Sequence, residues 1–171
     1  MALHTYWRYG VGAALALAGT FAVVFVAVIV MSRDMIVHEY YATYSDMLED
    51  NALERGWVPK LLPQSATEIR ETHCIERGDQ WIRFRFEPSD KGEMLAMVTP
   101  VARDVIPLPP HGPTIMCSWW PNTLLDSSKS GELSNYKFYK YKSTRSNLGY
   151  LAIEIDKPRA WYWQQGTWSE F

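Results

Sequence analysis

Residues 10–31, "GVGAALALAGTFAVVFVAVIVM", form one uninterrupted run without a charged residue or a proline. At a helical rise of about 1.5 Å per residue this run reaches roughly 30 Å, the thickness of the hydrocarbon core of a bilayer. It is longer than the apolar core of a cleaved signal peptide, and it ends in "VIVMSRDM" rather than in a small-residue cleavage site. We therefore expect an uncleaved transmembrane helix, with a cleaved signal peptide as the alternative.

The predicted helix divides the chain into four parts. These are a short amino-terminal tail (residues 1–9), the transmembrane helix (10–31), a juxtamembrane linker (32–44) and an extramembrane α+β domain (45–171). Arg8 precedes the helix and Arg33 follows it, so the positive-inside bias alone leaves the orientation open. Within the helix, Gly12, Ala16 and Gly19 form a small-residue stripe that would let another helix approach closely in lipid. Alternatively, these residues reflect the abundance of glycine and alanine in any transmembrane helix.

The chain contains two cysteines, Cys74 and Cys117, and both lie beyond the predicted helix. An even number of cysteines in a compact domain fits a disulfide in an oxidising compartment, and it also fits two unrelated buried thiols. The disulfide interpretation favours a single-pass membrane protein with a cytoplasmic amino terminus and a periplasmic or extracytoplasmic domain.

Residues 45–69 contain several residue types that restrict the backbone conformation. "SDMLEDNALERG" predicts a short helix that Gly56 ends in the left-handed conformation. The two prolines that follow require an extended bridge, because the residue before a proline is disfavoured in a helix. Ser65 and Glu68 have the spacing of a capping box and predict a second short helix. The residues that we expect to be scaffold rather than reactive groups are Gly56, Trp57, Pro59, Pro63, Ser65 and Glu68.

The stretch "GWVPKLLPQSATEI" resembles a pattern in small bacterial membrane-anchored or lipoprotein domains, G-W-aliphatic-P followed by aliphatic-P and S-A-x-x-I. The matching residues are Gly56, Trp57, Val58, Pro59, Leu62, Pro63, Ser65, Ala66 and Ile69, and the aromatic stretch "WIRFRF" follows them. The resemblance extends over residues 41–87. It implies a shared small fold, but it does not imply an activity.

Alternating side chains predict a β-hairpin from "THCIE" and "QWIRFRFE", which flank a turn that contains glycine. In the second strand the isoleucine and phenylalanines would face the core, whereas Trp81, Arg83 and Arg85 would face away from it. This second face could bind an anion or the carboxylate of a partner. The alternative is a solvated sheet surface on which arginines stack beside a tryptophan.

Three further strands are predicted at residues 136–142, 149–155 and 160–165, separated by short polar turns. A short helix is expected after Ser89. Together with the hairpin, these elements predict an α+β domain with a small antiparallel sheet of about five strands and two or three short helices.

No sequence motif predicts catalysis, because a glycine-rich phosphate loop, His-Glu-x-x-His and Gly-x-Ser-x-Gly are all absent from the sequence. The candidate metal ligands are His73, Cys74, His111 and Cys117. As neighbours in a predicted strand, His73 and Cys74 would leave opposite faces, which argues against a shared site. The net charge of −2 and the dispersed basic residues argue against nucleic-acid binding. We therefore expect no catalytic residue, no cofactor, no metal and no small-molecule substrate.

These observations favour a non-catalytic, single-pass accessory subunit of a multi-subunit membrane complex, for which an energy-transducing respiratory or photosynthetic assembly is one candidate. Its partners would be other transmembrane subunits, contacted through the helix, and the lipid bilayer. A membrane-anchored binding module for a soluble or surface partner is the alternative. An enzyme of unrecognised type is the second alternative.

Aromatic residues crowd the carboxyl-terminal end of the chain. Trp161 and Trp163 would share one strand face while Tyr162 occupies the other, and so small a domain would not easily bury all three. We therefore expect this end to contact a partner, together with a proline-rich segment earlier in the chain. The expected contact residues are Pro107, Pro109, Pro110, Trp161, Trp163, Trp168 and Phe171.

Overall fold

The computed structural model describes residue 25 and residues 36–107, 117–125, 132–142 and 148–166. The chain divides into two compact units, Met1–Ile36 and Val37–Phe171. The predicted membrane-spanning run, including Gly12, Ala16 and Gly19, lies outside the described residues except for Phe25. Among the residues that are described, no helix is long and apolar enough to span a bilayer.

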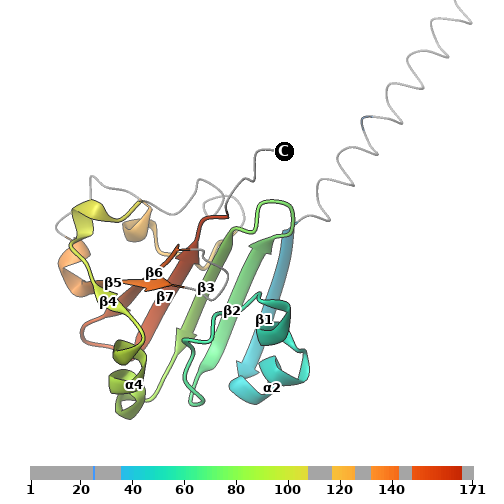
Figure 1. Cartoon of the computed structure of the whole chain (residues 1–171), viewed down its shortest axis with the longest axis horizontal. Coiled ribbons are helices and arrows are strands. Elements are labelled where there is room, and N and C mark those ends of the chain that lie inside the picture. The colour runs from blue at the N-terminus through green and yellow to red at the C-terminus, as the bar shows by residue number, and fades with distance from the viewer. Residues whose placement is uncertain (1–24, 26–35, 108–116, 126–131, 143–147, 167–171) are drawn as a thin grey trace, which may run out of the picture. The chain divides into compact units, whose positions relative to one another are not determined.

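A seven-stranded antiparallel sheet forms the centre of the second unit (Figure 1). Its strand order is β1-β2-β3-β7-β6-β5-β4. The strands are β1 (Ile36–Thr43), β2 (Thr67–Cys74), β3 (Gln80–Arg85), β4 (Thr99–Pro100), β5 (Tyr136–Lys142), β6 (Leu148–Glu154) and β7 (Arg159–Gln164). The antiparallel pairing of β3 with β7 joins the early hairpin to the meander at the carboxyl-terminal end. Residues far apart in the sequence therefore become neighbours at the middle of the sheet.

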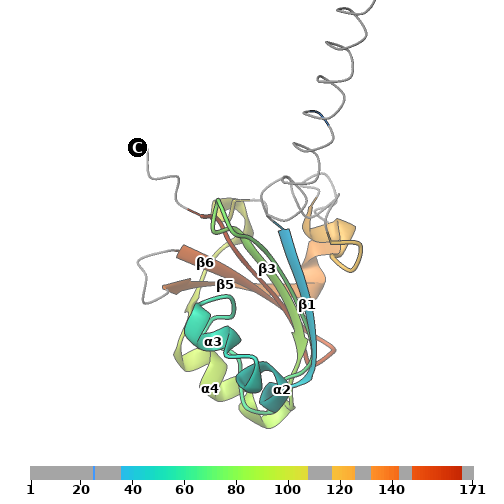
Figure 2. The same ribbon diagram turned by 90° about the vertical axis from the view of Figure 1, so that its right-hand side faces the viewer.

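The described helices are short and lie on one side of the curved sheet, as Figure 2 shows. They are α2 (Tyr44–Glu49), α3 (Ala52–Arg55) and α4 (Lys91–Ala96). The described 3₁₀ turns are Pro88–Asp90, Arg103–Val105, Asn122–Leu124 and Glu132–Asn135. The last two of these turns, coloured orange, lie on the other side of the sheet (Figure 2). Both faces of the sheet are therefore covered.

Each face of the sheet has its own core. The cluster on the helix side contains Met47, Ile69, Phe84, Leu151 and Tyr162, all fully buried. The cluster on the opposite side is rich in tryptophan, with Trp81, Trp120, Trp161 and Trp163 among its members. This division follows from the alternation of side chains along β3 and β7, which sends successive residues to opposite faces.

The predicted α+β class is confirmed, but the sheet has seven strands rather than about five. The expected hairpin is β2–β3, and the three strands expected near the carboxyl-terminal end are β5, β6 and β7. The two strands that were not predicted are β1 and β4, which stand at opposite edges of the sheet. Because β4 has only two residues, it is too short to produce an alternating pattern.

Strand β1 corrects the linker that was predicted at residues 32–44. Its sequence, "IVHEYYAT", contains one buried side chain, that of Tyr41. An edge strand buries little of either face, so the alternation that identifies a central strand is weak here. The folded domain consequently begins earlier than expected.

The helix predicted at residues 45–56 is present as two shorter helices, α2 and α3, which are broken at Asn51 with a φ of 56°. The cap of α2 is Thr43: its hydroxyl accepts from the Asp46 amide at 3.3 Å, and the Asp46 carboxylate accepts from the Thr43 amide at 2.9 Å. Gly56 ends α3 in the left-handed conformation, with a φ of 78°, so the predicted stop is confirmed.

The second predicted helix is wrong, because strand β2 begins at Thr67 where the helix was expected. The Ser65 hydroxyl accepts a hydrogen bond at 3.0 Å from the amide of Glu87, not from a helical turn. Glu68 has a φ of 48° and lies at an irregularity in the β2–β3 register. A capping box is a local spacing, whereas this irregularity belongs to the pairing of β2 with β3, so the spacing alone did not reveal it.

Candidate functional site

Four arginines gather on the tryptophan side of the sheet, in two rows that cross three adjacent strands. Arg70 of β2 lies directly opposite Arg83 of β3, and Arg85 of β3 lies directly opposite Arg159 of β7. Side chains at opposed positions of antiparallel strands approach within about 5 Å at their Cβ atoms, so each pair brings two positive charges together. We call Arg70, Arg83, Arg85 and Arg159 the arginine face.

Within the described residues, Glu68 is the one carboxylate that forms an ion pair with the arginine face. Its oxygens lie 2.8 Å from an Arg85 nitrogen and 3.7 Å from an Arg83 nitrogen. The hydrogen bond from Arg85 lowers the pKa of the Glu68 carboxyl, which is therefore ionised near neutral pH. One negative charge thus faces four positive charges.

Arg83 is the most enclosed of the arginines for which the structure gives a side-chain exposure, with 19% exposed against 46% for Arg85. Burial lowers the pKa of the Arg83 guanidinium, and the charges of Arg70 and Arg159 lower it further. Its Nε atom is buried without a hydrogen-bond partner. Arg83 is thus a partly desolvated cation that the described residues neutralise incompletely, and this arrangement favours an external anion.

Aromatic rings hold the outer arginines of the face in position. The Arg70 guanidinium lies over the Tyr40 ring at 5.6 Å, and the Arg159 guanidinium lies over the Trp161 ring at 5.8 Å. Such cation–π contacts fix a side chain without using its hydrogen-bond donors. The N–H groups of both guanidiniums can therefore still bind a carboxylate or a phosphate.

A groove of about 360 Å³ borders the arginine face at the β1 edge of the sheet. Arg70, Tyr40 and Trp119 line it, together with His38 and Glu39 of β1. The groove therefore combines the cationic side chain of Arg70 with the aromatic side chains of Tyr40 and Trp119. It extends the arginine face toward the sheet edge and gives a bound partner an apolar surface beside the charges.

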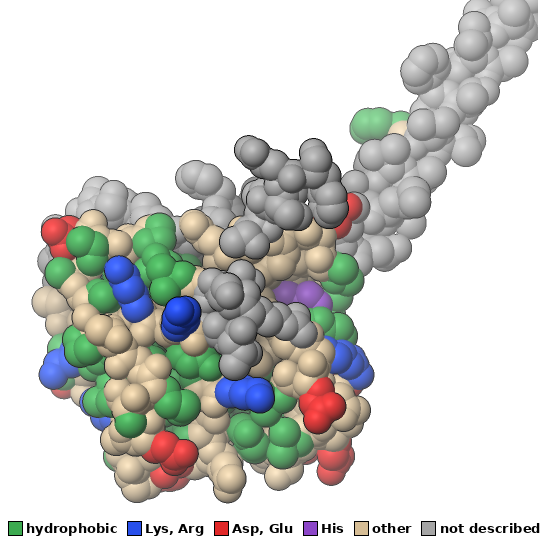
Figure 3. Space-filling model, viewed as in Figure 1, with side chains coloured by type: hydrophobic (Ala, Val, Ile, Leu, Met, Phe, Trp, Pro, Cys, Tyr) green, Lys and Arg blue, Asp and Glu red, His purple; other side chains and the backbone are tan. Residues whose placement is uncertain are grey.

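The helix side of the domain has a different character. Figure 3 shows this side, on which Lys and Arg side chains are scattered among acidic and apolar ones. The concentration of arginines is therefore a property of the β2–β3–β7 surface rather than of the whole molecule, whose net charge is −2.

A buried Glu71–His73 pair occupies β2 on the helix side of the sheet. The two side chains meet at 2.8 Å, between Oε1 and Nδ1, and they are 0% and 4% exposed. The Trp57 ring stacks on the His73 ring at 4.5 Å. Burial raises the pKa of the Glu71 carboxyl to about 7. The pair can hold a proton near neutral pH, but it is closed to a substrate in this structure.

One of the predicted scaffold residues, Trp57, contacts this buried pair. Trp57 is half-buried between the His73 ring and the Arg55 guanidinium, and Pro59 and Pro63 are buried. The carbonyl of Gly56 accepts a hydrogen bond at 2.6 Å from the side chain of Gln80. Because each of these residues has a packing or backbone contact, the scaffold interpretation stays the simplest prediction for them.

The predicted partner contacts at the carboxyl-terminal end require a correction. Trp161 and Trp163 are 3% and 1% exposed, and Tyr162 between them is fully buried. All three are buried because the sheet is covered on both faces. Pro107 is partly exposed. The other expected contacts, Pro109, Pro110, Trp168 and Phe171, lie outside the described residues.

The two cysteines are free and buried in the structure. Burial raises the pKa of the Cys117 thiol to about 11, and a hydrogen bond with Thr72 partly opposes this shift. The thiol is therefore protonated at neutral pH and is a poor nucleophile. The predicted disulfide between Cys74 and Cys117 is absent from the structure, which agrees with the alternative of two buried thiols.

Two members of the arginine face, Arg70 and Arg159, were not found by sequence reasoning. The alternation in "QWIRFRFE" places Arg83 and Arg85 on one face, but it does not reveal which strand lies beside them. The β3–β7 pairing, which sets Arg159 against Arg85, is a long-range contact. The sequence pattern that could have pointed to Arg159 is the same alternation in "RAWYWQ", which places Arg159 and Trp161 on one face.

A comparison with protein-family models finds a similarity in the first part of the domain. Residues 36–85 match the family model of the YbbD head domain. The match covers β1, α2, α3, β2 and β3, so this part of the chain is similar to a known small-domain family. No curated protein and no solved structure matches the chain. The finer G-W-x-P motif that we described stays a prediction.

Proposed function

We propose that this chain is a non-catalytic, single-pass accessory subunit of a membrane complex, and that its domain holds an acidic surface of a partner protein through the arginine face. The observation that supports this proposal is the direct opposition of Arg70 to Arg83 and of Arg85 to Arg159. Like charges in these positions oppose folding, and an anionic partner relieves the repulsion.

The width of the arginine face favours a protein surface over a single small anion. The face crosses β2, β3 and β7. Neighbouring strands lie about 4.8 Å apart, so three strands span roughly 10 Å. One carboxylate can bridge two guanidiniums but cannot reach all four. Several carboxylates on a partner surface match this spacing, and each forms paired hydrogen bonds with a guanidinium.

The predicted membrane anchor supports a binding face of modest size. A tether that holds two proteins in one membrane raises their effective concentration, so a small contact can maintain an assembly. The groove beside Arg70, with its Tyr40 and Trp119 walls, adds apolar contact to the charged one. Aromatic and arginine side chains are the residue types enriched in protein interfaces.

Co-purification from membranes in mild detergent tests this proposal. The double variant Arg70→Gln, Arg85→Gln removes two charges from the face, and we expect it to retain at least about tenfold less partner, since each lost charge-assisted contact contributes more than 1.4 kcal/mol. The matched control is Lys60→Gln, Lys142→Gln, which removes two exposed charges outside the face. Equal retention by both double variants would refute the proposal.

Replacing residues 10–31 with an unrelated transmembrane helix separates the accessory subunit from its alternative. An accessory subunit that packs through Gly12, Ala16 and Gly19 should lose part of its assembly when this stripe is replaced. A binding module for a soluble partner should tolerate the replacement. Retention of a soluble partner, lost only in the arginine variant, would favour the binding module.

A further inference from the structure

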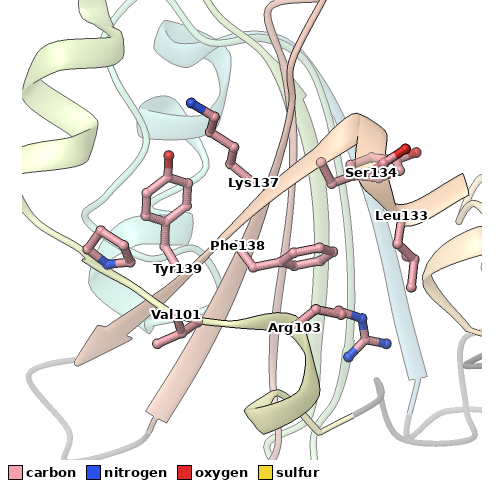
Figure 4. Close-up of a pocket in the computed structure, with 9 residues that line it drawn as sticks. Val101, Arg103, Leu133, Ser134, Lys137, Phe138 and Tyr139 are labelled. Carbon is pink, nitrogen blue, oxygen red and sulfur yellow. The ribbon is translucent and has the colours of Figure 1, made fainter. Parts of the chain in front are cut away.

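A second groove, separate from the arginine face, flanks β5 near the edge of the sheet (Figure 4). Its volume is about 660 Å³. Val101, Arg103, Leu133, Lys137, Phe138 and Tyr139 are among the residues that line it. A volume of this size lies within the range of pockets that bind a small ligand or a short peptide segment.

The short length of β4 creates this groove. Thr99 and Pro100 pair with Lys140 and Tyr139 of β5, and the Val101 amide donates to the Phe138 carbonyl at 3.0 Å. The chain then leaves the sheet in the 3₁₀ turn Arg103–Val105. Strand β5 has seven residues, so β4 flanks only a fraction of its length.

Arg103 is held in the groove by two contacts. Its guanidinium lies over the Phe138 ring at 5.4 Å, and one terminal nitrogen donates to the Ile106 carbonyl at 3.0 Å. Its Nε atom is buried and has no hydrogen-bond partner. Figure 4 shows Arg103, Phe138 and Leu133 on one side of β5. A cation fixed in this way loses little conformational entropy when it binds an anion.

The charges of the groove are of one sign. Arg103 and Lys137 are the charged residues among the described residues that line it, and none of these described residues is acidic. Lys137 is exposed and points to the other side of β5 from Arg103 (Figure 4). On the Arg103 side of β5 the walls are apolar, with Leu133 and Phe138 buried and Val101 half-buried. The complementary ligand carries a carboxylate beside apolar groups.

We infer that this groove binds an extended segment of a partner protein in which one acidic residue is flanked by apolar residues. The acidic side chain contacts Arg103 or Lys137, and the apolar side chains pack against Val101, Leu133 and Phe138. A protein segment suits a groove that follows a strand near the sheet edge, because an extended chain can lie along β5. The site is distinct from the arginine face, so either can fail without the other.

Selection of peptides from a random heptapeptide library tests this inference. The target is the full chain in lipid nanodiscs, after subtraction of peptides that bind empty nanodiscs. We expect enrichment of peptides that place one Asp or Glu between apolar residues. Binding of the strongest peptide is then measured by fluorescence anisotropy, with Arg103→Gln expected to weaken it at least about tenfold.

Two neighbouring lysines of β5 provide a matched comparison. Lys137 lines the groove and Lys140 does not, so Lys137→Gln should weaken peptide binding several-fold and Lys140→Gln should leave it unchanged. Because Lys137 is exposed, Lys137→Gln should leave the fold intact. It therefore still tests the site if Arg103→Gln lowers the midpoint of thermal unfolding. The double variant Arg70→Gln, Arg85→Gln should bind the peptide normally, which separates this site from the arginine face.

Three results would overturn the inference. The library enriches no peptide, or the enriched peptides lack an acidic residue, or their binding is insensitive to both Arg103→Gln and Lys137→Gln. Decanoate, a carboxylate on an apolar chain, is tested in parallel. If decanoate binds in an Arg103-dependent manner while no peptide is enriched, the groove takes a lipid-like carboxylate rather than a protein segment.

Discussion

Arg70 and Arg83 lie directly opposite each other on the neighbouring antiparallel strands β2 and β3. Two guanidiniums in this relationship repel each other, and the Arg85–Arg159 pair repeats the arrangement one step along the sheet. Side chains that oppose folding are typical of sites where function outweighs stability. The position of these charges, rather than their number, therefore distinguishes the arginine face from an ordinary solvated surface.

Arg83→Met should stabilise the domain. The change removes the cation that faces Arg70 and keeps a flexible chain of similar length, so we expect the free energy of unfolding to rise by about 0.5–1 kcal/mol. Chemical denaturation measures the effect. Arg83→Lys is the matched control, because it keeps the charge and should change stability little. If the denaturation midpoint of Arg83→Met is at or below that of Arg83→Lys, repulsion between Arg83 and Arg70 does not lower the stability of the domain.

The buried carboxyl of Glu71 predicts a pH dependence of stability. Burial raises its pKa from 4.5 to about 7, so the folded state binds a proton that the unfolded state has lost. The free energy of unfolding is therefore higher below pH 4.5, falls as the pH rises from 4.5 to about 7, and has lost this contribution above about pH 7. A shift of this size corresponds to a change of about 3 kcal/mol, which denaturation at a series of pH values would detect.

Glu71→Gln is the control for this pH dependence. The amide is isosteric, can still hydrogen-bond His73 and does not titrate, so the stability of the variant should vary less between pH 4.5 and pH 7. An unchanged pH profile in the variant would assign the dependence to another group.

The two cysteines predict a labelling pattern that depends on folding. Both are buried and free in the structure, so a maleimide reagent should react with neither in the folded chain and with both after denaturation without reductant. Burial also raises the pKa of the Cys117 thiol, which slows its reaction further. If denaturation without reductant exposes no reactive thiol, the predicted Cys74–Cys117 disulfide is formed in the cell.

Short-range patterns predicted the central part of the fold. The alternation in "YKFYKYK" and in "QWIRFRFE" identified β5 and β3, and the glycine at position 56 marked the end of α3. These features depend on residues that are close in the sequence. Edge strand β1 was missed because it buries one side chain, and the bulge at Glu68 was mistaken for a helix cap.

The arginine face could be only half predicted from the sequence. Arg83 and Arg85 share one strand and one face, so their proximity follows from alternation alone. Arg159 joins them through the β3–β7 pairing, which depends on the packing of the whole sheet. The same pairing buries Trp161 and Trp163, whose expected exposure rested on the assumption of a smaller core.

Gly149→Ala should destabilise the domain by overpacking its helix-side core. A Cβ at this position would overlap with the hydroxyl oxygen and ring carbons of Tyr162. Tyr162 is fully buried, and its hydroxyl donates to Gln164 at 2.9 Å, so the ring cannot move away easily. We expect a loss of about 1–3 kcal/mol, measured by chemical denaturation.

A double-mutant cycle with Tyr162→Leu tests the cause of this loss. Leucine removes the ring atoms that the new methyl group would strike, so Gly149→Ala should cost much less in the Tyr162→Leu background than in the native chain. The single variant Tyr162→Leu leaves a cavity and is itself expected to be less stable. If the two changes are additive, the effect of Gly149→Ala arises from the backbone of β6 rather than from contact with the tyrosine ring.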